Sequence, residues 1–473
     1  MSSGTWKPGE TKDRTGLYNW FVSLATSRIN AAKKGVVGIP IKADWGPCNQ
    51  LTICSDDTNI ISTFGDGGTV YLARRAAKGG KDRKPHKLVI YRMATAEAEQ
   101  AVATVEGSFK LIAKYKGERG NHFRASITEN IQNEDCVNLC IYEDSAMVSK
   151  YTIEKGDLDA LVEAVNNDAE SLVTAVRTGE TPLSPTASIS FAGGASGSEV
   201  RVEDYIKALT AFETAYMNTL ALDGVTDEAI LTMVKSWHNR VWNTGKMIQL
   251  VIGGTHADDK EPDIGNTRSK SCDNYGIINC IVGGIDAAGN MYSSAEMAPQ
   301  IAGAVAALPL NASITYKQLE DIVDVTVELT DTQICEATRA GSFVLFKDTD
   351  PESFEVKVKV ERGINTFTSF GKEAGQKLRK IKAISTMAAI DYDIGRYAMN
   401  NVLGELDNDA DGRAALFSGV SQYLETLANE HVISPDILVG LSEALVSEGD
   451  VVYMETQALT IDKIEQIFHK IYL

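Results

Sequence analysis

The chain has 473 residues, of which 44% are apolar and 7% are aromatic, and its formal net charge is −18. This composition is typical of folded proteins and excludes a disordered chain, while the length exceeds what one hydrophobic core usually serves, so we expect two to four domains. The 64 acidic residues against 46 Lys and Arg disfavour general binding to nucleic acid.

Membrane insertion and export are also disfavoured. No apolar run approaches the ~20 residues that a membrane span needs, and the first residues lack the apolar core of a signal peptide. The seven cysteines stand at irregular spacings, which indicates reduced thiols in a cytoplasmic compartment.

Residues 1–34 are polar and lack a helical period, yet they contain an apolar cluster. Its members are Leu17, Tyr18, Trp20, Phe21 and Val22. Such a cluster in an unanchored terminus predicts a strand that pairs with something outside this segment. The next run, VVGIPIKADWGP over 36–47, predicts a buried strand that stops at Trp45-Gly46-Pro47.

A basic stretch runs from Arg74 to Arg92 and holds eight Lys and Arg against one acid, Asp82. VYLARRAAK predicts a helix that stops at Gly79-Gly80, with bases in its last turn complementing the helix dipole. We interpret the stretch as the solvated end of that helix. A docking patch for an acidic partner is the alternative.

The sequence pattern changes between residues 95 and 185, where apolar and polar residues alternate as in antiparallel strands. A Pro/Ser/Gly-rich run over 181–198 predicts a domain boundary. Between 200 and 290 we expect two amphipathic helices, and His238 on the second of them is expected at its surface or boundary. The runs MIQLVIGG and YGIINCIVGG predict strands buried on both faces of a mostly parallel sheet.

From Tyr292 to Thr368 a small-residue helix over 295–307, dense in Ala and Gly, is expected to lie very close to a neighbouring element. An alternating strand over 354–360 then runs into Arg362-Gly363-Ile364-Asn365. After Thr368 we expect a basic stretch, two long helices and two closing strands. The last of these strands would carry Ile467, Ile471 and Leu473 on one face and Ile464, Phe468 and Tyr472 on the other.

Motifs that could carry chemistry are incomplete. The loop Asp407–Gly412 begins like an EF-hand, but its twelfth position is Ser418 instead of a bidentate Glu, so we expect a turn with Asp411 capping the next helix. The glycine pairs at 193, 253 and 283 lack the pattern of a phosphate cradle. Neither the cysteines nor the histidines are spaced as a zinc site or a catalytic constellation.

The order of these segments resembles that of contractile phage tail sheath proteins, of the type found in phages of Gram-positive bacteria and in phage-tail-like bacteriocins. AGAVAALPLNASITY (302–316) is similar to the family's AGLIAGTPLN-S-TY, and VERGINTFT (360–368) to its V-ERGINTLT. The resemblance continues on both sides, from GTW near the start through YKGERGNHF (115–123) to DGR at 411–413. It therefore spans essentially the whole chain.

The resemblance implies an α/β and α+β multidomain fold. Its parts would be an N-terminal linking arm (1–34), a middle α/β domain (35–94 and 186–291), an inserted β-rich outward-facing domain (95–185), an inner α/β domain facing a tube (292–450) and a C-terminal linking arm (451–473). The subunit-linking residues would be the apolar cluster near the N-terminus together with Ile464, Ile467, Phe468, Ile471 and Leu473. Possible tube contacts are Lys377, Arg379, Lys380 and Lys382, for which an ordinary solvated basic face is the competing interpretation.

The implied function is that of a non-enzymatic structural subunit, which polymerises as stacked hexameric rings around an inner tube and contracts to drive the tube through a cell envelope. Its partners would be other copies of itself, the inner tail tube protein, and baseplate and tail terminator proteins, without cofactor, nucleic acid or membrane insertion. It would belong to a virion tail or tail-like particle assembled in the host bacterial cytoplasm, and infectious phage and bacteriocin-like device both stay open. The alternative is a cytoplasmic α/β enzyme that binds a nucleotide-like ligand in the 200–290 domain.

Overall fold

The structure is a computed structural model, and it describes all residues except 1, 6–15, 20–34, 353, 373 and 473. Contacts divide the chain into two compact units. The larger unit comprises residues 33–388 and 463–473, and the smaller one comprises residues 1–32 and 389–462.

The larger unit is built on a seven-stranded sheet with the strand order β19-β15-β14-β13-β3-β5-β4. These strands are β3 (Val36–Ile41), β4 (Leu51–Cys54), β5 (Lys87–Arg92), β13 (Thr219–Ala221), β14 (Gln249–Ile252), β15 (Ile277–Cys280) and β19 (Ser342–Phe343). All neighbours are parallel except β4, an antiparallel edge strand. The predicted buried strands are confirmed, because every residue of β3, β14 and β15 is buried.

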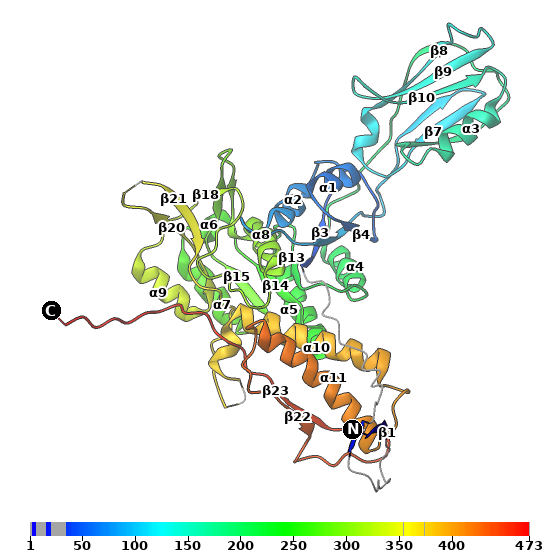
Figure 1. Ribbon diagram of the computed structural model, residues 1–473. Helices are drawn as coiled ribbons and strands as arrows, with labels where there is room; N and C mark the ends of the chain where they lie inside the picture. Colours follow the sequence, from blue (N-terminus) through cyan, green and yellow to red (C-terminus); the bar gives the residue numbers. More distant parts are fainter. Residues whose placement is uncertain (1, 6–15, 20–34, 353, 373, 473) are drawn as a thin grey trace. The chain divides into compact units, whose positions relative to one another are not determined.

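Helices cover both faces of this sheet (Figure 1). They are α1 (Asp57–Phe64), α2 (Val70–Lys78), α4 (Val202–Phe212), α5 (Glu228–Asn243), α6 (His256–Asp259), α7 (Pro262–Cys272), α8 (Ser294–Ala307) and α9 (Asp331–Ala340). Along β5, Leu88 and Ile90 enter the core shared with α2 and α8, whereas Val89 and Tyr91 enter the core shared with α4 and α5. The two-residue alternation of a strand thus serves two cores.

Helix α8 approaches α2 closely, as its small residues predict. A Cβ on Gly303 would stand 2.0 Å from the Ala76 carbonyl oxygen. Only glycine permits this approach, and the helix is buried along nearly its whole length.

The basic stretch is only partly a solvated surface, because Arg75 and Arg92 are buried. The Arg75 guanidinium donates to Gln300 Oε1 at 2.7 and 3.1 Å, lies 3.6 Å from Asp286 Oδ2 and stacks 3.8 Å above the Tyr292 ring. Arg92 donates to two backbone carbonyls. A sequence reading misses these residues because their partners lie far away in the chain.

His238 is buried, which corrects the expectation of a surface or boundary position. Its Nε2 lies 2.8 Å from the Ile248 carbonyl oxygen, and burial lowers the pKa of the imidazole. The helix α5 therefore uses His238 as an interior residue.

A buried acid at the start of α8 gives the larger unit a testable pH dependence. Asp259 accepts from the Ser294 hydroxyl at 2.5 Å and from the Ser294 amide at 2.8 Å, and burial raises its pKa to about 6 despite these bonds. The unfolded chain loses this proton near pH 4, so the contribution of Asp259 to the free energy of unfolding falls as the pH rises from about 4 to about 6.

We expect Asp259→Asn, which mimics the protonated acid, to flatten this dependence by roughly 2 kcal/mol. The measurement is denaturant unfolding of both proteins at pH 4.5, 5.5 and 7. Parallel stability curves for the wild type and the variant would contradict the assignment.

A β-rich insertion forms a separate core in the larger unit, seen at the upper right of Figure 1. One sheet has the order β10-β9-β8-β12 and the other β11-β7-β6. The elements are β6 (Val102–Val105), β7 (Phe109–Ala113), η1 (Glu118–His122), β8 (Phe123–Glu129), β9 (Cys136–Glu143), β10 (Ala146–Glu154), α3 (Leu158–Asn167), β11 (Val173–Arg177) and β12 (Thr186–Ser190). Because β12 pairs with β8, this sandwich extends beyond residue 185, where its end was expected.

The segment after 291 shares a core with the seven-stranded sheet. Strand β16 (Gly284–Asp286) precedes residue 291 and β17 (Met291–Tyr292) begins at it, while β18 (Ile322–Val325), β20 (Leu345–Thr349) and β21 (Val356–Val360) follow it, and η2 spans Gln376–Arg379. Ile301, Val358 and Val360 belong to the same cluster as Ile39. Residues on both sides of the expected domain boundary at 291/292 therefore belong to one continuous core, and α8 packs on one face of the sheet in that core.

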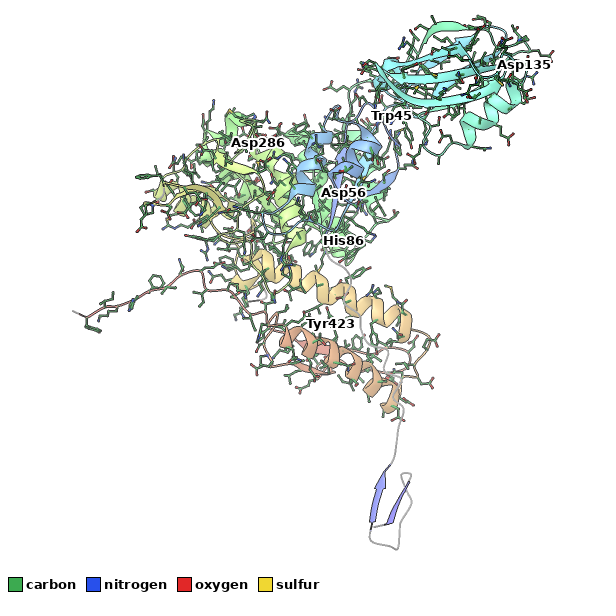
Figure 2. All side chains as sticks on the ribbon, turned by 45° about the horizontal axis from the view of Figure 1, so that its top comes forward. Trp45, Asp56, His86, Asp135, Asp286 and Tyr423 are labelled. Atoms are coloured by element: carbon green, nitrogen blue, oxygen red, sulfur yellow. The ribbon has the colours of Figure 1, made fainter. Side chains whose placement is uncertain are left out.

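The smaller unit contains most of α10 (Ile381–Asn401), α11 (Ala410–Asn429) and the hairpin β22 (Leu438–Leu441) with β23 (Met454–Gln457). Tyr423, labelled in Figure 2, donates to Asp393 Oδ2 at 2.8 Å and joins the two helices. The cap of α11 is Asp409, which accepts from the Gly412 amide, and not Asp411 as expected, because the helix begins at Ala410. Among the described residues no helix combines the length and apolar character required to cross a membrane.

Candidate interaction surfaces at the chain ends

The C-terminal segment, residues 463–472, is extended and, except at Glu465, exposed (Figure 1). The predicted last strand is absent from it: β23 ends at Gln457, and no strand follows among the described residues. Its large apolar side chains are mostly in solvent, with Phe468 at 92% and Ile464 at 84% exposure; Ile467, Ile471 and Tyr472 are exposed as well. Such a run in an extended segment is typical of a surface that another chain covers.

The N-terminal arm contains a parallel pair of strands, β1 (Ser2–Thr5) and β2 (Gly16–Asn19). Leu17 and Tyr18 lie in β2, whereas Trp20, Phe21 and Val22 lie outside the described residues, as does Leu473 at the other end. Among the residues that the structure describes, this sheet has two strands, so each of them has an outer edge that no described strand of the sheet covers.

Glu465 attaches the C-terminal segment to the larger unit. Its Oε2 accepts from the Arg362 guanidinium at 2.8 and 3.1 Å and from the Lys380 ammonium, and its Oε1 accepts from the Thr315 hydroxyl at 3.0 Å. Burial alone would raise the pKa of Glu465, but the bonds from Lys380 and Arg362 outweigh it, and the pKa is lowered. The carboxylate is thus held ionised, with a side chain only 10% exposed. We call these four side chains the Glu465 site.

Two residues of the Glu465 site, Thr315 and Arg362, come from the two segments that carry the family resemblance. The Gly363 amide donates to Thr315 Oγ1 at 2.9 Å, and the Tyr316 amide donates to the Val360 carbonyl at 2.7 Å. A Cβ on Gly363 would stand 2.9 Å from Ile314 Cγ2, so glycine lets the segments meet. Sequence reasoning missed Glu465 and Thr315. The available signal was that Glu465 is the single acid in the apolar closing segment, while the stretch around Lys380 has an excess of bases that could pair with it.

Asn365 holds the segment 360–368 to two other parts of the larger unit through buried hydrogen bonds. It is fully buried, its amide nitrogen donates to the carbonyls of Tyr275 and Leu378 at 2.8 Å each, and its Oδ1 accepts from the Phe367 amide. We expect Asn365→Ala to lower the free energy of unfolding by about 3 kcal/mol, because the two partly buried carbonyls and the Phe367 amide lose their partner. Thermal and denaturant unfolding measure this, with Asn167→Ala, at an exposed position, as the control that should change little. Equal stability of the two variants would contradict the role of Asn365.

The candidate tube contacts do not share one helix face. Lys377 and Arg379 lie in η2, Lys380 follows it and is paired with Glu465, and Lys382 is buried in α10. Lys377 is exposed, whereas burial and then the Arg362 charge lower the pKa of Arg379. In the single subunit, Lys377 is therefore the most available of the four for a partner.

A groove of about 660 Å³ adjoins the Glu465 site. Its walls come from residues 80–83, from Ala304, from residues 308–309 and 311–318, and from Lys463, Ile464 and Glu465. The start of the C-terminal segment is therefore part of a shaped surface. Among the described residues, no group of three or more His, Cys, Asp or Glu is placed to hold a metal ion.

Comparison with known proteins connects these surfaces to a family. Three family models match consecutive parts of the chain: the phage tail sheath protein beta-sandwich domain at residues 96–196, the phage tail sheath protein central domain at 198–372 and the phage tail sheath C-terminal domain at 373–473. A curated relative, the uncharacterized protein YqbK of Bacillus subtilis, is 26% identical over 490 residues, covering 100% of this chain and 99% of its own.

Solved structures agree in fold. The sheath tail protein of Desulfitobacterium hafniense superimposes with a TM-score of 0.74 at 26% identity, over 95% of this chain and 97% of that one. The contracted helical sheath of the anti-feeding prophage gives a TM-score of 0.56 at 11% identity, over 98% and 99% of the two chains, and supports the fold alone. Three domain models of one protein, matched in chain order, account for the chain from residue 96 to its end. The chain therefore belongs to the contractile phage tail sheath protein family.

Proposed function

We propose that this sheath subunit polymerises as stacked hexameric rings around an inner tube, and that the assembled sheath contracts to drive the tube through a target cell envelope. The observation that carries the proposal is the consecutive match of three sheath domains. The fold shared with the contracted anti-feeding prophage sheath supports it. The particle would be a phage tail or a tail-like device, assembled in the bacterial cytoplasm with tube, baseplate and terminator proteins.

The two chain ends would supply the contacts between neighbouring subunits. The C-terminal segment exposes apolar side chains that its own subunit leaves uncovered, and the paired strands β1 and β2 offer outer edges. Extended segments of this kind add to the sheet of a neighbour by strand pairing. A head-to-tail contact of this type that does not close into a ring propagates as a helix. Lys377 is our candidate for the tube contact.

Negative-stain microscopy of the full-length protein tests the proposal, with and without co-expressed inner tube protein. Striated tubes or sheaths are the expected result, with wider and shorter tubes once contracted. Only compact particles under both conditions would contradict it. No observation favours the alternative of an enzyme with a ligand in the 200–290 segment: the groove adjoins the C-terminal segment instead.

A further inference from the structure

The Glu465 site joins residues that are far apart in the chain. Thr315, Arg362 and Lys380 come from three different segments and all bond to one carboxylate. Within residues 463–472, Glu465 is the only described residue whose side chain hydrogen-bonds to the rest of the larger unit. The apolar residues that follow it are exposed. One side chain thus anchors the start of a segment that is otherwise free of its own subunit.

The charges around Glu465 favour the state in which its carboxylate is bonded to Arg362 and Lys380. Arg362, Lys380 and the neighbouring Arg379 bring three positive charges to the site, and two guanidinium nitrogens of Arg379 are already buried without a hydrogen-bond partner. Loss of the Glu465 carboxylate would leave Arg362 and Lys380 half-buried and without their acid. Bonds between ionised groups in such a setting are among the stronger ones in proteins.

We propose that Glu465 is a latch: it docks the start of the C-terminal segment on Thr315, Arg362 and Lys380, and so fixes where residues 466–472 leave the subunit to reach a second copy of this chain. The partner follows from the proposed function, since the second copy is the next sheath subunit. Holding the segment in place before contact lowers the ordering cost of association. Glu465 is in this sense a positioning residue.

Limited trypsin cleavage of the full-length protein tests the latch itself. Lys463 lies beside the latch and Lys470 lies beyond it, so cleavage after Lys463 should be slow in the wild type, with Lys470 as an internal reference. We expect Arg362→Gln, which leaves the cleavage sequence intact, to speed cleavage after Lys463 by about tenfold and to leave Lys470 unchanged. Arg339→Gln, the same change at an exposed position of α9, is the matched control.

Two further measurements guard against a variant that folds poorly. Glu465→Gln should give the same acceleration once its rate is divided by that of the matching free peptide. Raising the salt concentration of the wild type to about 1 M should also speed cleavage after Lys463, because salt screens the charges. Cleavage rates that stay at the wild-type value in both variants and in salt overturn the latch.

Assembly tests the positioning role. We expect the critical concentration for sheath formation, measured by sedimentation, to rise about tenfold in Arg362→Gln and Glu465→Gln, while thermal unfolding shows that both variants still fold. Faster cleavage with an unchanged critical concentration would overturn the positioning role while leaving the sheath function intact. A wild type that forms no sheath would count against the proposed function, and the cleavage test would still decide on the latch.

Discussion

Removal of residues 466–473 should give a folded subunit that no longer forms sheaths. The described side chains of this segment contribute almost nothing to their own subunit: Ile467 is 82% exposed, Phe468 92% and Tyr472 81%. Covering one such side chain on a neighbour contributes about 1.5–3 kcal/mol, and the loss repeats at every subunit contact in a helical assembly. The measurements are thermal unfolding for the subunit, and sedimentation with negative-stain microscopy for assembly.

Point variants separate the segment's apolar content from its length. Phe468→Ser combined with Ile467→Ser should reproduce most of the assembly defect. Ile131→Ser, at a fully exposed position of the sandwich, is the matched control and should assemble normally. A truncated protein that still forms sheaths at the wild-type concentration would refute the linking role of the segment.

The second large effect is expected at the contact between α2 and α8. Gly303→Ala should lower the free energy of unfolding of the larger unit by about 3 kcal/mol or more, because a Cβ there would stand 2.0 Å from the Ala76 carbonyl oxygen. The Ala76 carbonyl is part of the α2 backbone and cannot move aside as a flexible side chain would, so α2 and α8 would have to move apart. Denaturant unfolding followed by far-UV circular dichroism measures the change.

Gly395→Ala provides the opposite case in another helix interior. Apart from the neighbouring residues and backbone of α10 itself, no heavy atom lies within 4 Å of a Cβ at Gly395, so the alanine should stabilise α10 by about 0.8 kcal/mol through helix propensity alone. The two substitutions are chemically identical and should differ in sign. Similar effects from both would show that α2 and α8 are not packed as tightly as described.

Local pattern predicted the parts of this fold whose signal lies within a few neighbouring residues. The apolar runs around β14 and β15, the alternation in the sandwich and the small-residue helix α8 were all visible, since burial on one or both faces dictates each pattern. Family resemblance added the order of the domains. It also pointed to residues 302–316 and 360–368, which form much of the Glu465 site.

What escaped prediction depends on long-range partners. Arg75 and His238 are residue types that usually lie at the surface. Both are buried here, because Gln300 accepts from Arg75 and the Ile248 carbonyl bonds to His238, and the local sequence does not show these partners. The closing strand was predicted from alternation, but a strand needs a neighbour to pair with, and its own subunit supplies none among the described residues. Sequence patterning predicts interaction surfaces at the chain ends, and this stays a prediction; it gave no sign that Glu465 bonds to Thr315, Arg362 and Lys380.

The inserted sandwich begins and ends at the same point of the parent fold. The Ser198 amide donates to Thr95 Oγ1 at 2.9 Å, and short bridges join Glu99 to Ala195 and Val102 to Ala192. An insertion whose ends touch can be exchanged for another folded module with adjacent termini, without opening the sheet that carries it. Trp45, labelled in Figure 2, packs into the sandwich core from the parent strand region and would need a polar replacement. Thr95 and Ser198 are therefore the natural splice points for displaying a foreign domain in many copies along a tail.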